Sequence, residues 1–295
     1  MDSFPAEPQV MDLIRLALAE DIRGGDVTSQ LMIAADAVGV GTLAQRAAGV
    51  VAGLPVVAMV CREHDPKLQV SEWRGIEGTY AAGPRPLLRI AGPLRSLLSA
   101  ERVVLNFLQH LSGVATLTRQ FVERVAGTQA RIYDTRKTIP GLRRLDKYAV
   151  RCGGGHNHRM GLHDAVLVKD NHLASRPVEQ IGPFLHDLVQ RSRRADPRLS
   201  IEVEVDTLDQ LRQVLGVKGI DIVLLDNMDC ASMRQAVRMR DDAGLKGAVE
   251  LEASGGVTLQ TVRDIALAGV ERIAVGAITH SAPALDIGLD LEGGA

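Results

Sequence analysis

Residues 201–226 read IEVEVDTLDQLRQVLGVKGIDIVLLD, in which two short apolar runs, 201–205 and 222–225, flank an amphipathic stretch with helical spacing. Four further apolar runs, also separated by amphipathic stretches, lie near 130–133, 165–168, 249–252 and 273–275. This alternation is typical of βαβ units and predicts parallel strands. The six runs occupy roughly 150 residues, whereas a closed eight-stranded barrel takes about 250. We therefore predict an incomplete α/β barrel or an open doubly wound sheet.

The first half of the chain has a different pattern. Apolar residues at helical spacing over 8–20 predict an opening helix. Short apolar runs broken by glycine and proline between 38 and 92 predict a small antiparallel or mixed sheet. Residues 96–126 predict two helices with an interruption near Ser112-Gly113. The expected domains are an N-terminal domain at 1–114, joined by 284–295, and an α/β-barrel domain at 115–283.

Composition narrows the class of protein. The chain has 295 residues, 46% of them apolar, so it can bury a substantial core. A net charge of −2 and an aromatic content of 3% argue against a nucleic-acid partner. The most apolar stretch, 49–61, is broken by glycine and proline and is too short to span a bilayer, so no membrane partner is expected. Three widely spaced cysteines without a Cys-x-x-Cys pair fit the reducing cytoplasm.

Polar or glycine residues follow every predicted strand of the second half. They are Asp134, Lys169, Glu204 with Asp206, Asp226, Glu252 with Ser254, and Gly276. In barrel-type α/β folds, catalytic groups project from the C-terminal ends of the parallel strands. Packing gives no reason for polar side chains at that edge, so we expect a functional site there.

Basic side chains gather in the loops at this edge. Arg136 and Lys137 follow one strand, Lys169 follows the next, and His158-Arg159 comes after three glycines that permit close backbone approach to a ligand. A solvated basic loop and a flexible linker are the plainer explanations. The histidines also leave a metal site open, although Arg159 is a poor neighbour for a dication. Surface charges are expected at Arg143, Arg144, Lys147 and Arg151.

Two carboxylates and two glycine turns complete the predicted site. Glu204 and Asp226 end successive strands and can pair with a lysine, face ligand hydroxyls or bind Mg²⁺, with structural salt bridges as the alternative. Glu204 is preferred to Glu202 because it lies nearer the end of its strand. The turns at Ser254-Gly255-Gly256 and Gly276-Ala277 predict a phosphate cradle before two helices, and turns without a ligand are the alternative.

With these motifs the chain resembles the quinolinate phosphoribosyltransferase family over about residues 18–291. The central run 134–172, DTRKTIPGLRRLDKYAVRCGGGHNHRMGLHDAVLVKDNH, is the most specific part of the resemblance. Further matching segments lie at 20–21, 25–28, 100–102, 202–205, 225–227, 251–256 and 274–280. The chain departs from the family pattern in a turn at 216–219 that is about one residue longer than usual, and in a histidine at position 156.

The resemblance implies a two-domain fold, in which an N-terminal open-faced α/β sandwich accompanies an incomplete α/β barrel of six or seven strands. It also implies a homodimer in which each subunit donates Arg102 to the neighbouring active site, and it leaves room for a higher oligomer. Substrate binding is implied for Arg102, Arg136, Lys137, His158, Arg159, Lys169, Glu204, Asp226, Ser254, Gly255, Gly276, Ala277 and His280. A catalytic role is implied for Lys137, Lys169, Glu204 and Asp226.

The implied activity is that of a type II phosphoribosyltransferase. Such an enzyme converts quinolinate and phosphoribosyl pyrophosphate to nicotinate mononucleotide, pyrophosphate and CO₂ in NAD biosynthesis. Mg²⁺ is expected to enter with the pyrophosphate of the sugar substrate rather than on protein ligands, and no organic cofactor is expected. Three alternatives stay open: a molybdate-transport-associated paralogue of the same fold, a metal-dependent barrel hydrolase, and a non-catalytic sensor of phosphate ligands.

Overall fold

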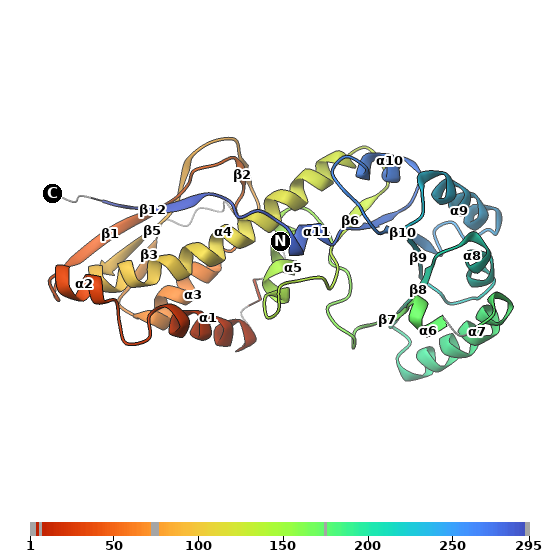
Figure 1. The fold of residues 1–295 in the computed structure, drawn as a ribbon, viewed down its shortest axis with the longest axis horizontal. Helices are drawn as coiled ribbons and strands as arrows, with labels where there is room; N and C mark the ends of the chain where they lie inside the picture. The colour runs from red at the N-terminus through yellow and green to blue at the C-terminus, as the bar shows by residue number, and fades with distance from the viewer. Residues whose placement is uncertain (1–3, 6–7, 72–76, 174–175, 293–295) are drawn as a thin grey trace. The chain divides into compact units, whose positions relative to one another are not determined.

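The computed structural model describes residues 4–5, 8–71, 77–173 and 176–292 (Figure 1). The chain divides into two compact units. The first comprises Met1–Arg119, Thr138–Gly154 and Ile278–Ala295, and the second comprises Gln120–Lys137 and Gly155–Ala277. Residues 138–154 therefore group with the first unit, although they lie inside the range expected for the barrel domain. The domain limits expected from the sequence stay a prediction.

The second unit is built on a sheet of six parallel strands. The strands are β6 (Arg131–Tyr133), β7 (Ala165–Val168), β8 (Ser200–Val205), β9 (Ile222–Asp226), β10 (Glu250–Ser254) and β11 (Arg272–Ala274). They pair in the order β6-β11-β10-β9-β8-β7, and in the described part of the chain β6 and β7 do not pair with each other. The predicted incomplete α/β barrel is confirmed, and each predicted strand forms within two residues of its expected position.

Amphipathic helices connect these strands and flank their outer side (Figure 1). They are α6 (Asp170–Leu173), α7 (Val178–Ala195), α8 (Leu208–Leu215), α9 (Cys230–Asp242) and α10 (Val262–Leu267). At the start of α8, the Thr207 hydroxyl accepts the backbone N–H of Gln210, and the Gln210 side chain accepts the N–H of Thr207. This capping box satisfies backbone groups that the helix leaves open. Leu211 and Val214 form the buried face of α8.

The residues after the glycine run extend the open edge of β6. The His156 N–H donates to the Ile132 carbonyl at 2.8 Å, and the His156 carbonyl accepts the Asp134 N–H at 3.0 Å. His156 thus forms a parallel bridge with Tyr133, and the two rings stack with centroids 5.3 Å apart. Gly154 has a φ of 89°, a left-handed conformation that glycine adopts without strain. The glycine run makes a turn that leads directly into a sheet contact.

The first unit carries a four-stranded antiparallel sheet in the order β12-β1-β5-β3. Its strands are β1 (Val38–Gln45), β3 (Gln69–Ser71), β5 (Arg85–Pro93) and β12 (Ile287–Leu291), and β2 (Gly49–Val50) pairs separately with β4 (Tyr80–Ala81). The helices are α1 (Pro8–Asp21), α2 (Val27–Met32), α3 (Leu54–His64), α4 (Leu94–Arg124) and α5 (Arg143–Cys152). Leu43 and Ile90 of the sheet, Cys61 of α3, and Leu97 and Val104 of α4 are buried around one shared space. Helices α3 and α4 cover one face of the sheet (Figure 1), which is the predicted open-faced α/β sandwich.

The predicted interruption of the helix near Ser112-Gly113 is wrong, because α4 continues through both residues. The buried Ser112 hydroxyl accepts the Ala52 N–H at 3.1 Å and donates to the Ala52 carbonyl at 3.3 Å. A Cβ atom on Gly113 would lie 2.2 Å from the carbonyl oxygen of Pro283. Gly113 is therefore required for close packing within a continuous helix, and it does not mark the end of a helix. Neither α4, at 31 residues, nor any other helix of the described residues is long and apolar enough to cross a membrane.

Helix α5 departs from the expectation of surface charges at one residue. Lys147 is fully buried, whereas Arg143, Arg144 and Arg151 are partly exposed. The neighbouring Asp146 is also buried, and its Oδ1 lies 2.7 Å from Nε2 of His110. Burial raises the pKa of Asp146. Lys147 is thus part of the interior of the first unit.

Candidate active site

A cavity of about 640 Å³ opens where the six strands of the second unit end. Each strand or the loop that follows it contributes to the wall, because parallel strands bring their C-terminal ends to one edge of the sheet. The polar part of the wall consists of Thr135, Arg136, Lys137, His158, Arg159, Lys169, Asp170, Glu204, Asp226, Asn227, Glu252 and Ser254. This edge is the one at which the sequence predicts the site.

One part of the wall is strongly cationic. Arg136, Lys137, His158, Arg159 and Lys169 all line the cavity. Burial and the positive charge of Arg136 lower the pKa of Arg159, which means that the two guanidinium groups lie close enough to repel. Within the described residues, Nε of Arg136 is buried and has no hydrogen-bond partner. Like charges and an unmet buried donor are unfavourable until an anion enters.

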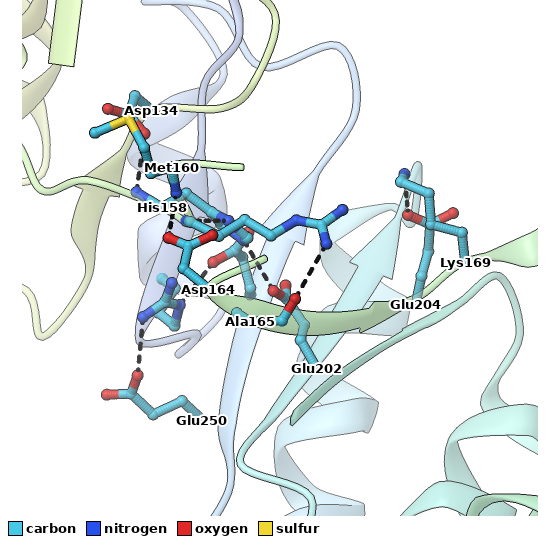
Figure 2. Close-up of polar contacts among 12 residues, drawn as sticks. Asp134, His158, Met160, Asp164, Ala165, Lys169, Glu202, Glu204 and Glu250 are labelled. Atoms are coloured by element: carbon cyan, nitrogen blue, oxygen red, sulfur yellow. Dashed lines mark hydrogen bonds and ion pairs between the residues drawn. The ribbon is translucent and has the colours of Figure 1, made fainter. Parts of the chain in front are cut away.

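The loop that carries His158 and Arg159 is held by Asp134, which directly follows β6 (Figure 2). Asp134 is fully buried; its Oδ1 accepts the His158 N–H at 2.8 Å and its Oδ2 accepts from Asn157 Nδ2 at 2.7 Å. The Arg159 guanidinium donates to the carbonyl of Ala165, the first residue of β7, at 3.2 Å. The loop is therefore fixed to two strands of the sheet.

The imidazole of His158 lies against two buried glutamates. Its Nε2 is 2.8 Å from Oε2 of Glu202 on β8 and 3.4 Å from Oε1 of Glu252 on β10. Although burial disfavours the imidazolium, these carboxylates raise the pKa of His158 to about 9. The Arg159 N–H donates to Nδ1 at 2.8 Å, which opposes the second proton, but hydrogen bonds to ionised carboxylates are the stronger contacts. The two carboxylates therefore favour the imidazolium form of His158, whereas the Arg159 N–H favours the form with an unprotonated Nδ1.

Arg272 completes this buried network. Its Nε donates to Oε2 of Glu252 at 2.6 Å, and its guanidinium carbon lies 3.6 Å from the centre of the Tyr133 ring. Burial opposes ionisation of Glu252, but His158 and Arg272 together lower its pKa. Burial and the charge of Glu252 raise the pKa of Glu202. Ligand atoms of His158 and the two glutamates lie within 4.8 Å of one another, a spacing that could hold a metal, yet the adjacent Arg272 favours an ion-pair network.

A second polar cluster lies at the ends of the next strands. Nζ of Lys169 donates to Oε2 of Glu204 at 2.9 Å (Figure 2). The Glu204 side chain is 7% exposed and that of Lys169 is 47% exposed, so the ammonium can still reach a ligand. Burial and the negative charge of Glu204 raise the pKa of Asp226, which ends β9. Glu204 lines the cavity, whereas Glu202 contacts His158. The sequence predicted Glu204 rather than Glu202 for the site because Glu204 lies nearer the end of the strand.

The two predicted glycine turns differ in placement. Ser254, Gly255 and Gly256 line the cavity, but the following helix α10 begins only at Val262 rather than directly after the turn. Gly276-Ala277 follows β11 at the start of the short helix α11 (Ala277–His280), and the lining residues of this cavity do not include either of them. A phosphate-binding role for the second turn stays a prediction.

The cavity thus brings together most of the residues predicted for the site. They are Arg136, Lys137, His158, Arg159, Lys169, Glu204, Asp226, Ser254 and Gly255. Arg102 on α4 and His280 in α11 belong to the first unit, and both are exposed. Their part in the site stays a prediction.

Sequence reasoning missed the anchoring role of Asp134 and the whole Glu252–Arg272 contact. Asp134 and Glu252 carried a signal, because both follow predicted strands. Arg272 carried none, since the predicted strand begins one residue after it. A partner 20 positions away in sequence cannot be recognised by local periodicity.

Comparisons with known proteins agree along the chain. The N-terminal domain model of quinolinate phosphoribosyl transferase matches residues 26–112, and the C-terminal domain model matches residues 114–290. The carboxylating nicotinate-nucleotide pyrophosphorylase of Mycobacterium leprae (strain TN) is 44% identical over 285 residues, which cover 95% of this chain and 96% of that protein. The decarboxylating, mitochondrial quinolinate phosphoribosyltransferase 2b of Nicotiana tabacum is 37% identical over 305 residues, covering 98% and 84%.

A solved structure extends the likeness to three dimensions. The nicotinate-nucleotide pyrophosphorylase from Francisella tularensis has a TM-score of 0.87 and 37% identity, and the match covers 99% of this chain and all of that one. The fold, both domain models and the relatives therefore agree. The chain belongs to the quinolinate phosphoribosyl transferase family.

Proposed function

We propose that this chain transfers the phosphoribosyl group of phosphoribosyl pyrophosphate to quinolinate, with loss of CO₂, and so makes nicotinate mononucleotide for NAD biosynthesis. The observation that carries the proposal is the cavity, in which a group of basic side chains shares one wall with two strand-end carboxylates. The printed names of the relatives point to the same reaction. The basic side chains suit a dianionic aromatic acid, and the carboxylates suit a ribose that becomes positive during the reaction.

The cationic wall suits the two carboxylates of quinolinate. Arg136 and Arg159 can each pair a carboxylate through two parallel N–H groups, and the imidazole of His158, whose pKa is raised to about 9, lines the same wall. The buried Nε of Arg136 would gain the partner that it lacks among the described residues. Lys137 and Lys169 would act in catalysis as compact positive charges that face the reacting anions.

The carboxylates suit the sugar. When the C–O bond to pyrophosphate breaks, the ribose carbon becomes positive, and Glu204 and Asp226 would stabilise that charge. The ring nitrogen of quinolinate then forms the new C–N bond and becomes cationic. The C–C bond to the adjacent carboxylate breaks next; its electron pair enters the ring, CO₂ leaves, and the ring carbon takes up a proton. The sequence needs no protein nucleophile, so positioning and electrostatics supply the catalysis.

Mg²⁺ would enter with phosphoribosyl pyrophosphate. Its oxygen ligands would come from the pyrophosphate of the sugar substrate, because Mg²⁺ prefers hard oxygen donors. Bound Mg²⁺ would neutralise the charge of the leaving pyrophosphate. The backbone N–H groups of the turn at Ser254 and Gly255 would bind phosphate at the same edge of the sheet.

The enzyme would work as a homodimer in which Arg102 of each subunit completes the partner's site. Arg102 is exposed on α4 of the first unit, and its guanidinium is of the same kind as the cations of the cavity wall. Gly276, Ala277 and His280 would add contacts to the phosphate groups.

Incubation of the purified protein with quinolinate, phosphoribosyl pyrophosphate and Mg²⁺ tests this function. We expect CO₂ and nicotinate mononucleotide in equal amounts, and neither product when the sugar substrate is omitted. Folded protein that yields neither product would contradict the proposal. Binding of quinolinate without turnover would favour a sensor, and failure to bind quinolinate would favour the molybdate-associated paralogue.

The spacing of His158, Glu202 and Glu252 keeps a metal-dependent hydrolase as the second candidate. Metal analysis of the purified protein separates the two functions. One tightly bound Zn²⁺ per chain would favour the hydrolase, whereas the transferase should require only Mg²⁺ added with the sugar substrate.

A further inference from the structure

The loops that follow β9 and β10 contact each other beside Asp226, at the wall of the cavity. Asn227 has a φ of 52°, a left-handed conformation that asparagine adopts more readily than most residues. Its N–H donates to the carbonyl of Ser254 at 2.9 Å, one residue beyond the point where Ser254 pairs with Asp226. Its side-chain Nδ2 donates to Oδ2 of Asp226 at 2.6 Å. The backbone N–H of Asn227 thus binds the end of strand β10, while its side-chain amide binds the Asp226 carboxylate.

Gly255 makes room for this arrangement. A Cβ atom at this position would lie 2.1 Å from Oδ1 of Asn227 and 3.0 Å from its backbone nitrogen. Gly255 also has a φ of +96°, which is strained for any other residue. The sequence predicted this glycine as part of a phosphate-binding turn. In the structure the Asn227 amide fills the space that a side chain at this position would occupy, so packing also requires glycine here. The two residues fit each other across the ends of β9 and β10.

We propose that Asn227 is a positioning residue that fixes the rotation of the Asp226 carboxylate toward the ribose subsite. This inference rests on the proposed function, in which Asp226 faces the positive charge that develops on the sugar. A carboxylate hydrogen-bonded on one oxygen cannot rotate freely, so its second oxygen keeps a defined direction.

The charges around Asp226 explain why it needs such a partner. Glu204 and Asp206 face it with negative charge, and Lys169 faces it with positive charge. Burial and Glu204 raise the pKa of Asp226, whereas the hydrogen bond from Asn227 is the leading influence that lowers it. Loss of that donor therefore moves protonation of Asp226 to higher pH. Activity should then fall first on the acid side.

Two substitutions separate the hydrogen bond from the backbone conformation. Asn227→Gly keeps the left-handed φ and removes the amide, and Asn227→Asp keeps the size but turns the donor into a like charge. The matched control is Ala231→Asp, which adds a carboxylate at an exposed position in the first turn of α9, where a helix tolerates negative charge. For each protein, kcat/KM for phosphoribosyl pyrophosphate is measured from pH 5.5 to 9 at saturating quinolinate, after its thermal melt shows a folded chain.

We expect Asn227→Asp to lower kcat/KM about tenfold at pH 6 relative to the unmodified enzyme, and by a much smaller factor at pH 8.5. Asn227→Gly should show the same trend with a smaller loss at pH 6, and Ala231→Asp should keep the unmodified profile. Equal losses at every pH for both Asn227 variants indicate only a structural role and overturn the inference. An unmodified enzyme without turnover would instead contradict the proposed function itself, so the two failures are distinguishable.

A double-mutant cycle tests the fit between the two loops. Gly255→Ala in the unmodified chain should impair kcat/KM strongly, because the new methyl group meets the Asn227 amide. In an Asn227→Gly background the same change should have a clearly smaller effect, since the contact with the amide is gone and only the strain at Gly255 and the close approach to the backbone nitrogen of residue 227 are left. Equal effects in both backgrounds would show that Asn227 does not set the requirement for glycine.

Discussion

Replacing Glu252 with glutamine tests the buried network under the cavity. The substitution keeps the shape of the side chain and removes a charge that both His158 and Arg272 contact. Glu252 is fully buried, so water cannot replace the lost interaction. His158 would keep its closer contact, to Glu202 at 2.8 Å, whereas Arg272 would keep its longer contact, to Glu250 at 3.4 Å.

The expected loss of stability follows from these contacts. Removing one partner of a buried ion pair costs about 3–5 kcal/mol, and the lower value applies because each cation keeps one carboxylate neighbour. In a chain of this size about 1 kcal/mol corresponds to about 2–4 °C, so the melting temperature should fall by about 6–12 °C. Differential scanning calorimetry at pH 7.5 measures this change.

Glu250→Gln provides the matched control on the same strand. Glu250 also contacts Arg272, at 3.4 Å, but its side chain is 36% exposed. Exposed ion pairs contribute about 1 kcal/mol or less, so this variant should melt within about 4 °C of the unmodified protein. If Glu252→Gln melts no lower than Glu250→Gln, the buried charge of Glu252 does not stabilise the second unit.

Three further changes test the site. Lys169→Ala should lower kcat/KM by about a hundredfold or more in a nicotinate mononucleotide assay, and Lys169→Arg should restore little of it, because a planar fork cannot replace a compact ammonium at the Glu204 contact. Equal mixtures of Arg102→Ala and Lys169→Ala subunits should regain up to about a quarter of full activity, since half the dimers are mixed and each mixed dimer has one intact site; no regain despite subunit exchange would rule out a donated arginine. His158 has a folded pKa of about 9, above its usual 6.5, so its contribution to stability is complete below pH 6.5 and is lost as the pH rises through about 9. The difference in unfolding free energy between the unmodified protein and His158→Asn, measured in urea, should therefore be larger at pH 6 than at pH 9.5, and equal differences would mean that His158 is neutral in the folded protein.

The parallel strands could be predicted because their signal is local. A buried strand of four to six residues between amphipathic helices is visible in any short window, as at 201–205 and 222–225. Helix α4 could not be predicted whole, because its Ser112-Gly113 pair has the composition of a break. Glycine is required at position 113 because the backbone passes close to the carbonyl of Pro283, which lies far away in sequence.

The cavity wall was predictable for a topological reason. Once the strands are parallel, the residues after them must meet at one edge, and this brings Lys169, Glu204 and Asp226 together. The residues beneath the wall follow no such rule. Glu202 and Glu204 share a strand face, and only their depth along the strand sends one to His158 and the other to the cavity.

The place of β12 in the first unit has a consequence for how the protein is made. β12 pairs with β1, yet more than two hundred residues separate the two strands in the chain. At about 5–20 residues per second, a ribosome takes about 10–40 s to pass from the end of β5 to β12. One edge of β1 stays open during that interval, whereas every strand of the second unit has already been synthesised before β12 appears. The nascent chain is therefore exposed to edge-to-edge association during most of its translation, until β12 closes that edge.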